Sequence, residues 1–94
     1  MKQATSEWIE RAEGDWKVAQ RERQSGDPVW NVVCFLAQQC AEKYLKAFLE
    51  EMDVPFGKTH DLVALLNATG GKPPELETMR SQLAYLSPFA IMAR

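Results

Sequence analysis

Residues 28–52 read PVWNVVCFLAQQCAEKYLKAFLEEM, and this stretch decides the fold. Apolar side chains recur in it every three to four residues, which is the spacing of a helix face. They are too numerous for one face, so we expect a helix that is central in a bundle or that contacts two partners. They are Val29, Val32, Val33, Phe35, Leu36, Cys40, Tyr44, Leu45, Phe48 and Leu49.

The segment before this helix predicts another long helix, over residues 5–23. Its apolar side chains fall at helical spacing: Trp8, Ala12, Trp16 and Ala19. The sequence SGDP at positions 25–28 separates the two helices. We expect Asp27 to be the N-cap of the second helix and Pro28 its first residue.

Three shorter helices are predicted after residue 52. Thr59 is the expected cap of a third helix, which continues through three leucines, and a fourth helix is expected over residues 74–86. A short fifth helix follows Pro88. The side chains expected to point inward are Leu62, Leu65, Leu66, Leu76, Met79, Leu83 and Leu86.

No segment alternates polar and apolar residues as a strand does, so the predicted fold is all-α. We expect an up-and-down bundle of four main helices plus a short fifth C-terminal helix, as a single domain over residues 1–94. A chain of this size can build one core, but it leaves much apolar surface for a partner to cover.

Composition favours a cytoplasmic protein. The net charge is −2, with 46% hydrophobic and 26% charged residues, and no segment is apolar enough for a membrane span or a secretory signal. Without a basic stripe, we do not expect extended nucleic-acid binding. Cys34 and Cys40 lie on one predicted helix in positions unsuited to a disulfide, so both are predicted to be buried thiols.

Several classes of catalytic site are missing from the sequence. There is no glycine-rich phosphate loop, paired-cysteine metal motif or nucleophile elbow, and His60 is the single histidine. We therefore predict no metal, no cofactor and no catalytic residue. The acidic pairs 50–51 and 75/77 lie near predicted helix ends and are interpreted as solvated charge.

Two segments resemble a known family. CFLAQQCAEKYLKAFL at 34–49, followed by Thr-His-Asp-Leu at 59–62, resembles the Gln-Ala-x-Glu-Lys-x-x-Lys helix and the Thr-His-Asp-Leu sequence of HEPN domains. These are helical, nucleotide-associated domains of prokaryotes. The tryptophan-containing first helix and the tail 86–94 are also similar to the family, so the resemblance covers nearly the whole chain.

The resemblance implies four or five helices, frequent dimerisation, and association with a small nucleotidyltransferase as a neighbour or a fused domain. Some HEPN proteins belong to toxin–antitoxin pairs, and some cleave RNA with an arginine placed four to six residues before a histidine. The residues at positions 54–56, before His60, are valine, proline and phenylalanine, so that ribonuclease motif is absent.

The candidate binding site centres on Gln39, Lys43 and Lys46, which recur at i, i+4 and i+7 beside Gln38 and Glu42. An anionic phosphate approaching this face would meet amide and ammonium donors together. The alternative is that Glu42 and Lys46 form an ordinary i,i+4 ion pair on a solvated face.

His60 and Asp61 fall in the first turn of the third predicted helix and, with Arg94, complete the candidate ligand-binding or partner-binding residues. We expect His60 to bond a neighbouring helix or a ligand, and a structural bond is favoured because a lone histidine lacks a catalytic partner.

The aromatic residues Trp8, Trp16 and Trp30 are predicted to lie in the core or a dimer interface, with stacking on a nucleobase as the alternative.

Three functions follow. The leading hypothesis is a binding module for a nucleotide, a nucleotidyltransferase partner or both, acting as a dimer without catalysis of its own. The second is a divergent HEPN ribonuclease in which His60 works with a sequence-distant arginine, Arg80 or Arg94. The third is a structural homodimerisation module, suggested by the two-sided apolar second helix.

Overall fold

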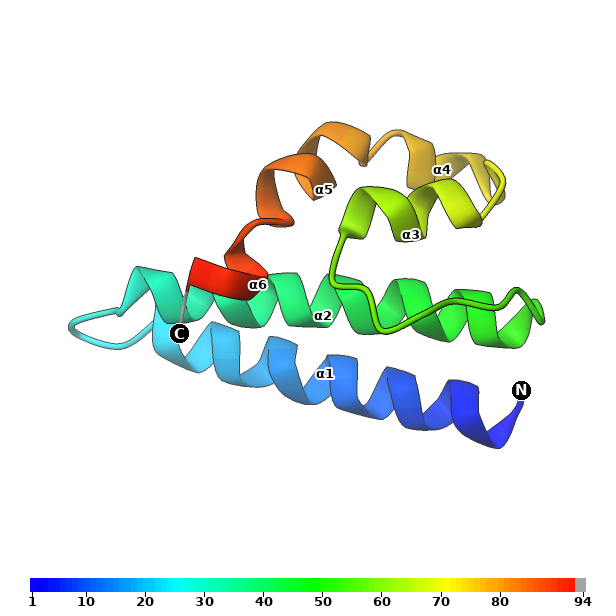
Figure 1. Cartoon of the computed structure of the whole chain (residues 1–94). Coiled ribbons are helices and arrows are strands. Elements are labelled where there is room, and N and C mark those ends of the chain that lie inside the picture. Colours follow the sequence, from blue (N-terminus) through cyan, green and yellow to red (C-terminus); the bar gives the residue numbers. More distant parts are fainter. Residues whose placement is uncertain (93–94) are drawn as a thin grey trace.

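The computed structural model describes residues 1–92, and two long antiparallel helices form its base (Figure 1). They are α1 (Gln3–Arg23) and α2 (Trp30–Glu51). Shorter helices follow, and α3 (Leu62–Ala68), α4 (Pro74–Glu77) and α5 (Arg80–Leu86) lie on the other side of α2. The last helix, α6 (Phe89–Met92), lies against α2. Since residues 1–92 contain no strand, the predicted all-α class is confirmed.

Small side chains let α1 and α2 pack closely. Ala12 and Ala19 on α1 and Ala47 on α2 are buried, and short side chains at a helix contact bring the two axes together. An ion pair also joins the helices, with Lys43 Nζ 2.6 Å from Asp15 Oδ2. The α1–α2 pair is therefore the platform on which the rest of the chain is placed.

The start of α2 differs from the prediction. The helix begins at Trp30 rather than Pro28, and Val29 is its N-cap, with no side-chain cap bond. The backbone N–H of Val29 donates to the Glu22 carboxylate at 3.0 Å. A carboxylate from α1 thus holds the residue before α2, and the predicted capping role of Asp27 is wrong.

A leucine core fills the space between α2, α3 and α5. Phe48, Phe56 and Leu76 pack against its edge. Burying one leucine stabilises the fold by roughly 2 kcal/mol relative to leaving it exposed. The core leucines are Leu45, Leu49, Leu62, Leu65, Leu66 and Leu83, each at most 6% exposed, so the predicted inward leucines of the third helix are confirmed.

α3 begins later than predicted, because Asp61 and not Thr59 is its N-cap. Asp61 Oδ1 accepts hydrogen bonds from the backbone N–H groups of Val63 (3.0 Å) and Ala64 (3.2 Å). These are two of the donors that a helix start leaves unpaired. His60 therefore lies in the loop before α3, where it can turn back toward α2.

Residues 74–86 form two helices instead of the predicted one. The Thr78 hydroxyl donates to the carbonyl oxygen of Glu75 (2.6 Å), and the N–H of Met79 bonds Leu76, only three residues back (3.1 Å). This tight turn interrupts the helix. Met79, predicted to point inward, is 45% exposed as a result, whereas Leu83 is buried as predicted.

The first turns of α2 leave apolar side chains uncovered. None of the residues from Trp30 to Ala37 is buried in the described chain, and Trp30 and Trp16 are 58% and 50% exposed. Their predicted place in the core is therefore wrong, while a place in a dimer interface stays a prediction. Cys34 is also only half-buried, although both cysteines are free thiols as expected.

Within residues 1–92, no helix has the length and apolar character needed to cross a membrane.

Candidate functional site

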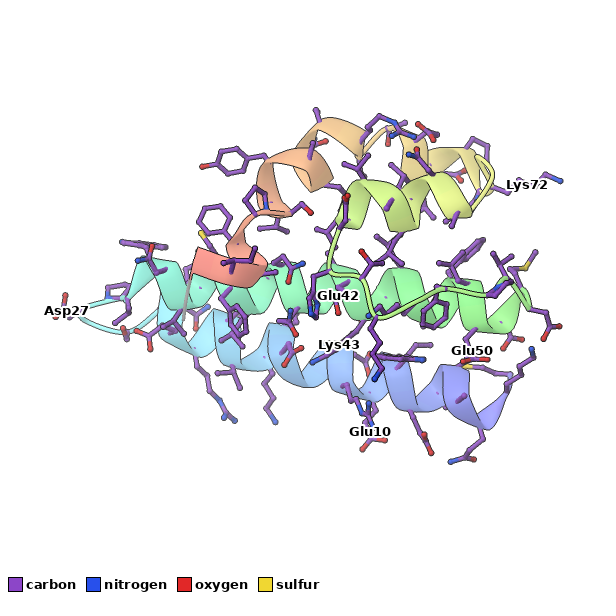
Figure 2. The ribbon with its side chains drawn as sticks, viewed as in Figure 1. Glu10, Asp27, Glu42, Lys43, Glu50 and Lys72 are labelled. Atoms are coloured by element: carbon purple, nitrogen blue, oxygen red, sulfur yellow. The ribbon has the colours of Figure 1, made fainter. Side chains whose placement is uncertain are left out.

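Glu42, labelled in Figure 2, is a buried carboxylate on α2 that bonds three other polar residues singled out in the sequence, Gln38, Lys46 and His60. Its side chain is 4% exposed, and donors reach it from three directions. Gln38 Nε2 (3.4 Å) and Lys46 Nζ (3.1 Å) come from one helical turn on either side, since residues four apart share a helix face. His60 Nδ1 (2.8 Å) comes from the loop before α3.

The charge on Glu42 follows from these contacts. Burial raises the pKa of a carboxyl, but the hydrogen bonds and positive charge that His60 and Lys46 supply hold the pKa of Glu42 below its usual value. The ionised carboxylate can only accept hydrogen bonds, so His60 Nδ1 carries the hydrogen between them. In the neutral imidazole ring, Nε2 is then the unprotonated nitrogen.

Lys46 is held between the carboxylate and two aromatic rings. Its Nζ lies 5.5 Å from the ring centroid of Trp8 and 5.9 Å from that of Phe56. The two rings meet edge to face at 6.1 Å. Both lysine–ring distances fit a cation–π contact. The predicted Glu42–Lys46 ion pair therefore exists, but it is buried and not part of a solvated face.

Gln38 joins α2 to the loop that carries His60. Its carboxamide is fully buried, donates to the backbone carbonyl of His60 at 3.0 Å and accepts from Gln39 Nε2 at 2.7 Å. Within the described residues, no buried side-chain nitrogen or oxygen lacks a hydrogen-bond partner. The network is fully satisfied, so it holds His60 in one orientation.

Lys43 belongs to a different environment from Lys46. Its ammonium pairs with Asp15 on α1, and both side chains are about four-fifths buried. Figure 2 shows Lys43 beside the α1–α2 contact. The predicted row of Gln39, Lys43 and Lys46 is therefore divided, with Lys43 engaged by α1 and the other two joined to the Glu42 network.

His60 stands between two surface hollows. Its side chain is 51% exposed. We name the first the aromatic hollow; it has a volume of about 460 Å3 and is lined by Trp8, Lys46, Phe56, Gly57, Lys58 and His60. The second, the C-terminal hollow, has a volume of about 470 Å3 and is lined by His60, Asp61, Val63, Ala84, Ser87, Pro88, Ala90 and Ile91.

The two hollows differ in charge. The aromatic hollow is lined by Lys46 and Lys58 and by no carboxylate among the described residues, whereas Asp61 lines the C-terminal hollow. Asp61 is engaged in capping α3, and Ser87 Oγ accepts from the N–H of Leu62 at 2.9 Å. Polar groups of the C-terminal hollow therefore support the start of α3, and the aromatic hollow is better suited to an anion.

A known protein family matches nearly the whole described chain. The family model described as the HEPN domain matches residues 5–94. This chain belongs to the HEPN domain family. Neither a curated protein nor a solved structure matches it.

The HEPN resemblance rests on residues that meet in space. Glu42 and Lys46 belong to the first motif segment and His60 to the second, and the buried bond of His60 to Glu42 joins the segments. The bond of His60 to a neighbouring helix, expected from its sequence position, is confirmed. The third segment used for the resemblance ends at Arg94, which lies outside the described residues.

Three residues of this HEPN domain site were missed by sequence reasoning. Trp8 was predicted only as a core or interface residue with stacking as the alternative, and Phe56 and Lys58 were treated as loop. Aromatic and basic residues inside a short loop that precedes His60 were the available signal. The described part of the chain holds no cluster of three potential metal-binding side chains.

Proposed function

We propose that this HEPN domain is a binding module that takes a phosphate-bearing ligand, such as a nucleotide, in the aromatic hollow. One observation carries the proposal: lysines, a histidine and two aromatic rings line one hollow that has no carboxylate in its described lining. Phosphate needs positive charge and N–H donors, and a nucleobase needs an aromatic face.

The side chains divide these tasks. The ammonium of Lys46 is engaged with Glu42 and the two rings, so it contributes charge at the floor of the hollow. Lys58 is exposed and its ammonium is available as a donor. Lys46 lies over both aromatic rings, so stacking uses the parts of the half-buried Trp8 and Phe56 rings that stay exposed. Arg11 also lies over Trp8, 5.6 Å from the ring centroid, and adds positive charge nearby.

The buried network supports binding by fixing these groups before a ligand arrives. Gln38 and Glu42 hold the backbone and the ring of His60, and no rotamer freedom of that ring has to be lost on binding. Gln39 takes part through Gln38, while Lys43 is tied to α1 and is proposed to support the helix pair.

The test is calorimetric titration with adenosine monophosphate. Lys58→Gln should weaken binding about fivefold, corresponding to about 1 kcal/mol for one exposed charge contact. Lys72→Gln is the matched control, because it removes the same charge from an exposed residue in the turn after α3, well away from the hollow (Figure 2). If Lys58→Gln and Lys72→Gln weaken the binding of adenosine monophosphate equally, the aromatic hollow is not the binding site.

A second proposed function is association through the uncovered start of α2, with a second copy or with a nucleotidyltransferase-type partner. Val29 and Trp30 are more than half exposed, and Ile91 on the adjoining α6 is 72% exposed. Large exposed apolar patches usually mark interaction sites.

Light scattering at micromolar concentration tests the homodimer. Trp30→Glu should give a monomer, because it places a charge in the proposed contact. Met52→Glu changes an equally exposed apolar residue at the opposite end of α2 and should keep the dimer. A wild-type monomer would leave the partner protein as the only candidate for this surface.

For the ribonuclease alternative, the geometry bears on Arg80 only, since Arg94 lies outside the described residues. Arg80 makes two hydrogen bonds to Glu77, at 3.0 and 2.7 Å, and does not line either hollow beside His60. Incubation of RNA with the protein and with His60→Ala tests it, since His60-dependent cleavage would establish an enzyme.

A further inference from the structure

The orientation of His60 sets a condition on any anion that binds beside it. Nδ1 donates to Glu42, so Nε2 is the lone-pair acceptor of the neutral ring, and the side chain of His60 is 51% exposed and lines both hollows. Phosphate and sulfate oxygens are also acceptors, and two acceptors repel. An oxyanion therefore gains a hydrogen bond from His60 only when Nε2 is protonated.

We propose that the aromatic hollow binds an oxyanion together with one proton, which His60 takes up at Nε2 while its Nδ1–H stays on Glu42. The inference rests on the proposed function, because it concerns the same hollow. It names the ligand chemistry, a phosphate-type dianion, and the regulation, which is an affinity that rises as the pH falls.

Charged groups of both signs lie near His60. Glu42 faces the ring from α2, and its negative charge is shared with Lys46. Lys58 and Asp61 flank His60 in the loop, and Arg11 lies over the Trp8 ring on α1. The described lining residues from α3, α5 and α6 carry no charge.

The balance of these charges changes with one proton. With neutral His60, the Glu42–Lys46 pair is neutral as a unit, and Lys58 is the one uncompensated cation in the described lining of the aromatic hollow. Protonation adds a second cation and a second N–H donor at the same place. Two cations match a dianion, and the Glu42 carboxylate keeps its hydrogen bond from Nδ1 in both forms of the ring.

Lys46 does not replace His60 as a hydrogen-bond donor to the anion. Lys46 has its ammonium on the carboxylate and against two ring faces, so it supplies charge but is poorly placed to give a further hydrogen bond. Histidine is the side chain that ordinarily changes charge between about pH 5 and 8. A test of the coupling therefore compares pH values within that range.

The experiment titrates the full chain with sulfate and with adenosine monophosphate at about pH 6 and about pH 8. Sulfate is the main probe because its own charge is constant over this range, whereas phosphate esters change theirs near pH 6. Sulfate affinity should be several-fold higher at the lower pH, at most about tenfold per pH unit for one proton. Calorimetry in two buffers of different ionisation enthalpy measures the proton uptake directly.

A second readout uses the fact that His60 is the single histidine in the chain. Its imidazole gives one set of proton resonances. If His60 takes up a proton when sulfate binds, sulfate must raise the pH at which these resonances titrate, by an amount fixed by the change in sulfate affinity with pH. This measurement depends on the native ring and needs no variant.

Two variants separate the roles in the proposal. His60→Gln keeps an amide that can bond Glu42 but cannot take up a proton, so sulfate binding should become weak and independent of pH. Lys58→Gln should weaken binding at both pH values and keep the pH slope, because it removes a constant charge.

The outcomes distinguish this inference from the function on which it rests. Nucleotide and sulfate binding of equal strength at both pH values would overturn the proton coupling and leave the binding site in place. A pH slope that persists in His60→Gln would also overturn it. If neither probe binds at either pH, both the coupling and the proposed oxyanion site are wrong.

Discussion

His60 Nδ1 lies 2.8 Å from Oε1 of Glu42, which is eighteen residues earlier in the chain. This single bond joins the middle of α2 to the loop that enters α3. Since Gln38 also holds the backbone carbonyl of His60 at 3.0 Å, the loop is tied to α2 through both its side chain and its main chain. The site and the packing of α3 therefore share one polar network.

Glu42→Gln should destabilise the fold by about 3 kcal/mol. The change leaves the Lys46 ammonium buried without a negative partner, and removing one partner of a buried ion pair is costly. The free energy of unfolding from urea titration measures the loss. In the double variant Glu42→Gln/Lys46→Met the unpaired charge is gone, so most of the stability should return; a double variant no more stable than Glu42→Gln would contradict this account.

Stability should fall in acid partly because of Glu42. Its pKa in the folded protein is lowered, because hydrogen bonds and positive charge from His60 and Lys46 outweigh the opposing effect of burial. The stabilisation is therefore present above the pKa of the unfolded chain and is lost as the pH falls through the lower folded pKa. The difference in urea midpoint between the wild type and Glu42→Gln should be smaller at about pH 3 than at about pH 7. A constant difference would show that Glu42 does not titrate in this way.

Asp61→Ala should cost about 1 kcal/mol, since it removes the side chain that caps α3. Asp61→Asn is the matched control, because an asparagine oxygen can accept the same two backbone hydrogen bonds. Thermal or urea unfolding measures both variants. Equal losses would mean that the negative charge of Asp61 matters and the cap does not.

The two cysteines should differ in reactivity. Burial raises the pKa of the Cys40 thiol to about 11, whereas Cys34 is half-buried near the start of α2. The thiolate is the reactive form, so Cys34 should be alkylated first in the native protein at about pH 8, with Cys40 reacting only after unfolding in urea. Mass spectrometry of the alkylated peptides measures which cysteine is modified first. Rapid alkylation of Cys40 in the native protein would contradict this prediction, because it would show that the thiol is accessible without unfolding.

Local sequence determined the long helices and several of their contacts. The apolar spacing of residues 28–52 predicted α2 within two residues at its start and one at its end, and the i,i+4 spacing already placed Glu42 beside Lys46. Such features follow from the helical repeat alone. The inward leucines of α3 were predictable for the same reason.

Tertiary structure decided which of these residues became a site. The sequence could not show that the Glu42–Lys46 pair is buried, that Lys43 turns to Asp15, or that Phe56 and Trp8 enclose the Lys46 ammonium. These depend on the path of the loop between α2 and α3 and on how α1 lies against α2. A helix face is set by residues three and four positions apart, so it can be predicted from the local sequence. Burial and long-range contacts depend on how the whole chain packs, so the spacing of residues in one segment does not predict them.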